Sequence, residues 1–313
     1  MTHSSGGYLH LPEGWERVSA GGPGPFVTSE VLRRPDGTLV RWRSRSHRKG
    51  RGGGVRAAEG HDRQGVWWRP DRPDWWIGVL FAVGSLCFAL ASSASQWGSA
   101  SRPWIGATFF AGSLFFTTAA YLQYSQAANV EHGVGANGSP RARWRVASWE
   151  PRRIDWVASA VQLVGTLFFN LSTFTALNHD LSVHQSNVRV WTPDALGSIC
   201  FLVASELAYA EVCHRWVCFH GRSLSWRIVA LNLVGSLAFG AAAIAGYIEP
   251  STGELVSTRL ANAGTTLGAL CFLVGALLLL PEAGEAEPAP APEPAPAPAP
   301  GGGGARRRGR RRL

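Results

Sequence analysis

Residues 83–92 read VGSLCFALAS, residues 164–173 read VGTLFFNLST, and residues 196–205 read LGSICFLVAS. The same pattern recurs at residues 111–120, 234–243 and 267–276. Its skeleton is a glycine, a small residue, two variable positions and a phenylalanine, followed three and four positions later by two small residues. Each of six apolar stretches contains this motif once, which indicates an internal repeat rather than an accident of composition.

The motif places small residues and an aromatic ring on one helix face. Its glycines are Gly84, Gly112, Gly165, Gly197, Gly235 and Gly268. Its phenylalanines are Phe88, Phe116, Phe169, Phe201, Phe239 and Phe272. Small residues let helix backbones approach closely in lipid, so we predict helix packing, with a phenylalanine ring over the glycine of a neighbouring helix. The alternative is a pore or ligand groove lined by the small residues.

The six apolar stretches are long enough to cross a bilayer. About 20 residues, each rising about 1.5 Å, span a hydrocarbon core of about 30 Å. The stretches are continuous rather than alternating, which favours helices over barrel strands. The predicted spans are residues 75–95, 103–124, 156–178, 193–213, 226–247 and 259–280. We therefore predict an all-α bundle of six transmembrane helices over residues 75–281, built as three repeated two-helix hairpins.

Composition and charge support a multi-pass membrane protein. The 313 residues are 46% hydrophobic and 16% charged, whereas soluble domains average about 25% charged, so an ordinary soluble enzyme is excluded. Of the 30 Lys and Arg, 13 lie in residues 1–74, five in 125–155, three in 214–227 and six in the C-terminal tail, against single residues at Arg102, Arg189 and Arg259. Because Lys and Arg accumulate in cytoplasmic loops, we expect both termini in the cytoplasm. The near-exclusive use of Arg over Lys indicates a GC-rich bacterial genome, and hence the bacterial cytoplasmic membrane.

The glycine-serine-aromatic motif in paired spans resembles the YrhK-like family (YrhK domain) of small bacterial integral membrane domains. The resemblance covers about residues 75–281. It implies a two-helix hairpin as the unit, so that spans one and two, three and four, and five and six would form three hairpins. It implies neither an activity nor a catalytic residue.

The flanking segments are basic. Residues 1–74 are rich in Gly and Arg, and we expect them to be mostly disordered, with a β-hairpin over Ser29–Ser44 around a Pro-Asp-Gly turn. Residues 282–313 combine Pro, Ala and Glu with a final Gly/Arg cluster, which favours an extended, disordered tail. Besides the bilayer itself, the Arg clusters would attract anionic lipid at the cytoplasmic face. Nucleic acid is disfavoured because the tail lacks aromatic residues for stacking, and a homo-oligomer stays open.

Three of the polar residues within the predicted spans lie at a similar depth. Glu206 lies seven residues before Cys213, while Gln162 and Asn232 each lie six residues after the tryptophan that begins a span. We predict that the three form an intramembrane polar layer about 10 Å from the cytoplasmic boundary. A charge in hydrocarbon prompts a functional hypothesis, namely that Glu206 carries a proton or binds a cation. The alternatives are a protonated Glu206 bonded to Gln162 or Asn232, and a side chain that reaches the interface.

The segment CHRWVCFH, with Cys213 and Cys218, has the residue types of a zinc site but not a common spacing, and a reducing cytosol argues against a disulfide. Motifs for nucleotide phosphate, serine hydrolysis, zinc peptidase and haem are not found in the sequence. We therefore predict no cofactor, metal or enzyme activity. The leading prediction is a non-enzymatic helix-packing or partner-binding module, and the alternative is a small transporter or proton/cation pathway using Glu206.

Overall fold

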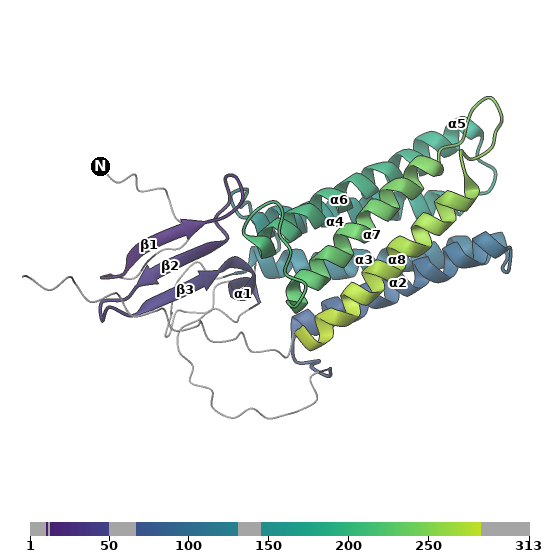
Figure 1. Cartoon of the computed structure of the whole chain (residues 1–313). Helices are drawn as coiled ribbons and strands as arrows, with labels where there is room; N and C mark the ends of the chain where they lie inside the picture. Colours follow the sequence, from purple (N-terminus) through teal and green to yellow (C-terminus); the bar gives the residue numbers. More distant parts are fainter. Residues whose placement is uncertain (1–10, 12, 50–66, 131–144, 283–313) are drawn as a thin grey trace, which may run out of the picture.

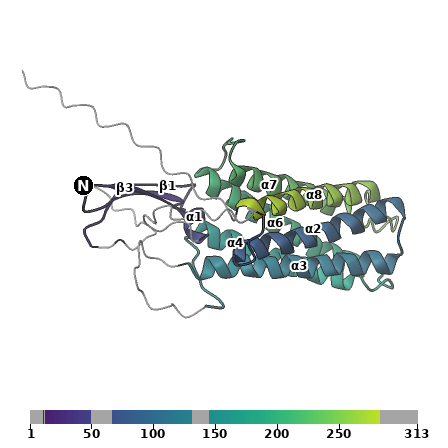
Figure 2. The same cartoon turned by 90° about the horizontal axis from the view of Figure 1, so that it is seen from below.

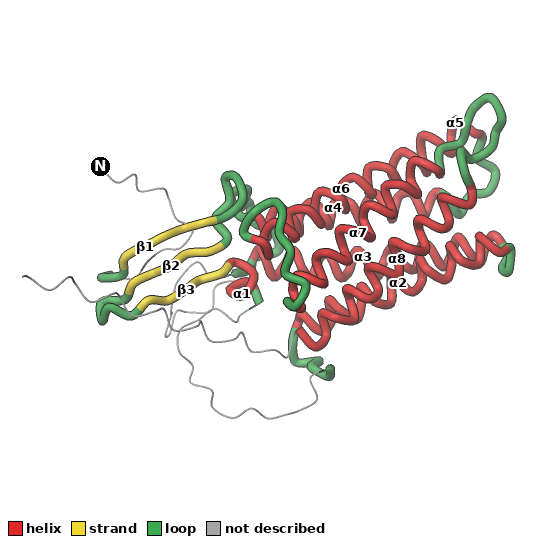
Figure 3. The backbone as a smooth tube through the Cα atoms, viewed as in Figure 1, coloured by secondary structure: helices red, strands yellow, loops and turns green. Residues whose placement is uncertain are grey.

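The computed structural model describes residue 11 and residues 13–49, 67–130 and 145–282. A small sheet and a short helix lie at one end of a long helical bundle (Figure 1). The elements are β1 (Glu16–Gly21), β2 (Ser29–Arg33), β3 (Leu39–Arg43), α1 (Ser44–Arg48), α2 (Pro73–Trp97), α3 (Arg102–Ala128), α4 (Ile154–Thr175), α5 (Val183–Ser186), the π-helix η1 (Asn187–Trp191), α6 (Thr192–Cys213), α7 (Leu224–Ala245) and α8 (Thr258–Glu282). We call the end that carries the sheet the sheet end and the opposite end the far end; Figure 3 separates the strands from the long helices by colour.

Six helices are long and apolar enough to cross a membrane, which confirms the predicted helical spans. Prolines near the start of α2, α3 and α6 suit the first helical turn, where the missing N–H costs nothing. The helix α2 ends at Gly98, which adopts the left-handed conformation that glycine tolerates. Leu90, Leu171 and Leu237 are at least half exposed on the outside of the bundle, a surface suited to lipid.

The six long helices form a closed ring. Each packs against the next in the order α2, α3, α4, α6, α7 and α8, and α8 returns to α2. Figure 2 shows them running side by side from the sheet end to the far end. Successive long helices run antiparallel around a common axis, which extends from the sheet end to the far end of the bundle.

Motif glycines meet within each successive helix pair. A Cβ on Gly84 would lie 3.0 Å from the Gly112 carbonyl oxygen and 2.9 Å from the Phe116 ring. The same contact joins Gly165 to Gly197 and Gly235 to Gly268. Backbone therefore touches backbone in α2–α3, α4–α6 and α7–α8, with a motif phenylalanine over each glycine, as the motif predicts.

Small hydroxyl side chains join one helix pair to the next. Hydrogen bonds link Ser113 to Thr173 at 3.0 Å, Ser205 to Ser236 at 2.8 Å and Ser92 to Thr266 at 2.8 Å. These bonds connect α3 to α4, α6 to α7 and α2 to α8. Hydrogen bonds between helices of this kind stabilise membrane bundles by roughly 0.6 kcal/mol each.

The N-terminal segment is more ordered than its composition predicts. Strands β2 and β3 form the hairpin expected around the Pro-Asp-Gly turn, and β1 adds a third antiparallel strand. The basic stretch after β3, expected to be disordered, is instead helical over Ser44–Arg48. The reason is tertiary: a 2.8 Å hydrogen bond joins Thr28, directly before β2, and His214 at the end of α6, and α1 contacts acidic residues of the bundle. The predicted tail at residues 283–313, with its Arg cluster, lies outside the described residues.

Cys213 and Cys218 form a disulfide, which corrects the expectation of two thiols. His214 takes a left-handed conformation at the end of α6 and turns the chain back. The two Cα atoms then lie 5.6 Å apart, within bridging range. Bonded to each other, these sulfurs are not thiolate ligands for zinc.

Candidate functional site

The axis of the ring is closed at its middle by the six motif phenylalanines. All six are buried, with at most 7% of any side chain exposed. Phe88, Phe169 and Phe239 form one triangle, with ring centroids 6.1–6.4 Å apart. Phe116, Phe201 and Phe272 form a second, with centroids 5.7–6.2 Å apart. The triangles stack at 5.1–5.5 Å, so a double layer of aromatic rings blocks the axis.

A cavity of about 380 Å³, the far-end cavity, lies beyond the first triangle. Phe88, Phe169 and Phe239 form its floor, and loop residues including Asn178 and Ile248 line its outer part. Asp194 is the one charged side chain among the described residues that line it. Within the described part of the chain, no group forms a hydrogen bond or ion pair with Asp194.

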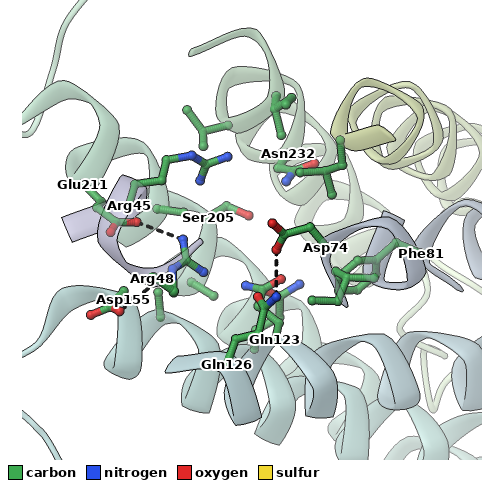
Figure 4. A pocket seen from close by; sticks show the side chains of 18 of the residues that line it. Arg45, Arg48, Asp74, Phe81, Gln123, Gln126, Asp155, Ser205, Glu211 and Asn232 are labelled. Atoms are coloured by element: carbon green, nitrogen blue, oxygen red, sulfur yellow. Dashed lines mark hydrogen bonds and ion pairs between the residues drawn. The ribbon is translucent and has the colours of Figure 1, made fainter. Parts of the chain in front are cut away.

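A second cavity of about 80 Å³, the sheet-end cavity, lies beyond the other triangle and has room for several water molecules. Phe272 and Phe81 lie at its inner part, while Gln123, Gln162 and Asn232 supply uncharged polar groups. Gln123 donates to the Gln162 side-chain oxygen at 3.2 Å. Figure 4 labels Phe81, Gln123 and Asn232 around this cavity, together with Arg45 and Arg48, which come from α1.

The helix α1 closes the sheet-end cavity with its basic side chains. Arg48 lies 3.3 Å from Glu211 and 3.9 Å from Asp155, and Ser44 donates to Glu211 at 2.8 Å. The contact from Arg48 to Glu211 is drawn in Figure 4. One five-residue helix thus binds acidic groups on α4 and α6.

The last helix is bound in the same way. Arg45 lies 3.1 Å and Lys49 2.5 Å from Glu282 at the end of α8. Burial lowers the pKa of Arg45, but attraction by Glu282, Glu211 and Asp74 outweighs it, so the pKa is raised above its ordinary value. We refer to α1 with Lys49 as the basic cap, and to Asp74, Asp155, Glu211 and Glu282 as the acidic ring. Because buried ion pairs stabilise only when every charge is matched, the cap and the ring depend on each other.

Both cavities are built from fixed positions of the motif. The residue three before the motif glycine lines the sheet-end cavity in α2, α4 and α7 and the far-end cavity in α3, α6 and α8; these residues are Phe81, Gln162, Asn232, Phe109, Asp194 and Thr265. Polar residues at the sheet end also lie at fixed distances along the sequence from the motif glycines. Asp74, Asp155 and Ser225 lie ten residues before a motif glycine, and Gln126, Glu211 and Glu282 lie fourteen after one.

Residues at these two distances meet within each helix pair. Gln126 donates to Asp74 at 2.8 Å, and Ser225 donates to Glu282 at 2.5 Å. Asp155 and Glu211 share Arg48. Each of the helix pairs α2–α3, α4–α6 and α7–α8 therefore has one such polar contact at the sheet end. The residues of the acidic ring lie at fixed distances along the sequence from the motif glycines.

The three residues predicted as a polar layer separate. Gln162 and Asn232 line the sheet-end cavity, but Glu206 lines neither cavity and is half-buried. Glu206 lies nine residues after its motif glycine, and the matching residues Tyr121 and Leu277 are exposed. The spacing therefore directs Glu206 toward the outside of the ring.

Sequence reasoning missed the acidic ring, the basic cap and Asp194. Charges at the ends of spans are ordinary, so Asp74, Asp155 and Glu211 carried no signal as single residues. Their common register from the motif glycines is the signal that would have found them. For the basic cap, the sequence offers only a charge run, which is typical of a solvated segment.

No family model, no curated protein and no solved structure matches this chain. The resemblance to the YrhK-like family, and the origin of the three hairpins as repeats of one unit, therefore stay predictions.

Proposed function

We propose that this protein is a gated pathway for cations across a membrane, running along the axis of the six-helix ring. The observation that carries the proposal is the pair of cavities, each bearing carboxylates, on opposite sides of one aromatic layer. The distribution of Lys and Arg predicts that the sheet end faces the cytoplasm, whereas the Cys213–Cys218 disulfide at that end is typical of an oxidising compartment; a pathway along the axis is compatible with either orientation.

Carboxylates favour cations at both ends. Asp194 lines the far-end cavity, and Asp74, Asp155 and Glu211 of the acidic ring line the sheet-end cavity. Rings of Asp and Glu select cations in membrane pores, and charges of one sign in a low-dielectric cleft concentrate their counter-ions. The basic cap supplies cations from the chain itself in the places that mobile cations would take.

The structure then corresponds to a closed pathway. Six stacked phenyl rings form a dry constriction of the kind that gates by excluding water. The basic cap is a second closure, since Arg45, Arg48 and Lys49 lie across the sheet-end cavity. Glu206, on the outside of the ring, has no part in this pathway.

Ion flux through the full chain in liposomes tests the proposal. Because the aromatic layer and the basic cap close the axis in series, we expect little K⁺ flux for the wild type and at least a tenfold rise for the Phe201→Ala/Arg45→Ala double variant, which opens both, with K⁺ preferred over Cl⁻. The matched control is Arg33→Ala, which removes a cation whose ion pair with Glu16 is exposed, and which leaves flux unchanged.

Two outcomes contradict the proposal. One is the absence of K⁺ flux from the wild type, the double variant and Phe201→Ala alike, with each shown to be folded. The other is a flux that prefers Cl⁻. Either result returns the protein to the prediction of a helix-packing or partner-binding module.

A further inference from the structure

We infer that the far-end cavity binds a small lipophilic ammonium ion, with the cationic nitrogen at Asp194 and an apolar body against the aromatic floor. The inference rests on the proposed function for the movement of this ligand across the membrane. Binding of the ammonium ion depends on the cavity alone, so an experiment can test binding and transport separately.

The cavity has the size and surface of a small-molecule site. Its volume of about 380 Å³ lies within the usual range of roughly 300–1,000 Å³. Apolar side chains, mainly phenylalanine, alanine and leucine, make up more than half of its lining, and serine, threonine, asparagine and Asp194 supply the polar part. We expect such a site to take an organic cation, because its volume and the apolar part of its lining suit a molecule with an apolar body and its described lining holds a single carboxylate.

Asp194 sets the charge of the ligand. The carboxylates of the acidic ring all have partners within the chain, from Gln126 on Asp74 to Lys49 on Glu282. Asp194 has none in the described residues, although it lies in a helix that crosses the membrane. A carboxylate held there is expensive and by default functional, and a cation from outside the chain would supply the missing partner.

Aromatic rings surround the place where that cation would lie. Phe88, Phe109, Phe169 and Phe239 line the cavity together with Trp191. A cation within about 6 Å of an aromatic ring centre gains roughly 0.5–2 kcal/mol, and quaternary ammonium groups are recognised in this way. An anionic ligand would meet both Asp194 and the negative faces of the rings.

The π-helix η1 positions the part of the far-end cavity that Trp191 lines. η1 brings Trp191 to the wall, where its indole N–H donates to the Ala243 carbonyl at 2.8 Å. Asn187 exchanges hydrogen bonds with the backbone of Ile248 at 2.7 and 3.1 Å, which fixes the loop between α7 and α8. Asn262 also lines the cavity, and its amide nitrogen is buried without a hydrogen-bond partner among the described residues. Because π-helical segments are frequent at functional sites, the π-helix η1 agrees with a ligand site beside it.

Titration calorimetry on the full chain in detergent micelles tests the inference. The probes are benzyltrimethylammonium, benzylsulfonate as an anion of similar size, and K⁺ as a competitor. We expect binding of the ammonium ion, no binding of the sulfonate, and no displacement by K⁺ at equal concentration. Asp194→Asn weakens ammonium binding at least tenfold, and Asp194→Glu restores most of it.

Glu206→Gln is the matched control, because it removes another half-buried carboxylate of α6 that lines neither cavity; it leaves the affinity unchanged. Equal affinity in Asp194→Asn and wild type, or equal losses in Asp194→Asn and Glu206→Gln, would overturn the inference. Ammonium binding without K⁺ or ammonium flux refutes the pathway alone. K⁺ flux in a protein that does not bind the ammonium ion refutes this site alone.

Discussion

The far-end cavity and the sheet-end cavity are built from the same helix positions but differ in how their charges are matched. At the sheet end, the carboxylates meet Arg45, Arg48 and Lys49 from the chain's own N-terminal segment. At the far end, Asp194 faces an open volume more than four times as large. The comparison teaches that the position three residues before a motif glycine can line a cavity whose carboxylates are matched by basic side chains or a cavity whose carboxylate has no partner among the described residues. What decides between them is the segment that covers the end of the bundle.

The largest effect is expected where the two cavities are separated. Phe201→Ala removes a ring that lies within 6.0 Å of three others and is 1% exposed, so the free energy of unfolding should fall by about 4 kcal/mol. Phe174→Ala, at a ring that is 59% exposed on the outside of α4, should cost less than about 1 kcal/mol. Reversible unfolding in mixed micelles measures both; similar losses would mean that the aromatic layer is not tightly packed.

The next effect distinguishes a matched carboxylate from an unmatched one. Glu282→Ala leaves Arg45 and Lys49 without their acidic partner, and we expect a loss of about 3 kcal/mol. Asp194→Ala leaves no partner behind, so the free energy of unfolding should change by less than about 1 kcal/mol or rise. The same unfolding assay checks both variants. A loss at Asp194 as large as that at Glu282 would break the comparison between the two ends.

The smallest effect concerns the frame that both cavities share. Gly165→Ala brings a methyl group to 2.8 Å from the Cys200 Cβ and 3.2 Å from the Gly197 carbonyl oxygen, and overpacking of this kind costs about 1–3 kcal/mol. Gly240→Ala is the control, because nothing lies within 4 Å of the added carbon; it should gain about 0.5–1 kcal/mol from the better helix propensity of alanine. Thermal unfolding of the two variants side by side would show opposite shifts. Shifts of the unfolding temperature in the same direction would mean that close contact between motif glycines does not hold the ring of helices together.

The bundle was predictable because its signals are local and periodic. Length and hydropathy locate the helices, and the spacing from glycine to phenylalanine predicts which faces meet. The contact of Phe116 on Gly84 follows from that spacing. Gln162 and Asn232 reach the axis for the same reason, since both lie three residues before a motif glycine.

The closure of the bundle was not predictable in this way. The residues that form the ion pairs of the basic cap are far apart in the sequence; Arg48 and Glu211, for example, are separated by 163 positions. Nothing local to residues 44–49 marks them as helical, because their order comes from acidic groups on other helices. Glu206 attracted interest as the deepest charge, but depth along a helix carries no information on which way the side chain faces. Asp194 lies at the start of its predicted span, where a charge is common.

The basic cap also constrains the order in which the chain is completed during synthesis. Lys49 is made before any of the acidic ring, yet its partner Glu282 follows 233 residues later. At about 5–20 residues per second, on the order of ten seconds or more pass between the two. The ion pair between Lys49 and Glu282 can therefore form only after α8 has been synthesised, so the basic cap is completed last.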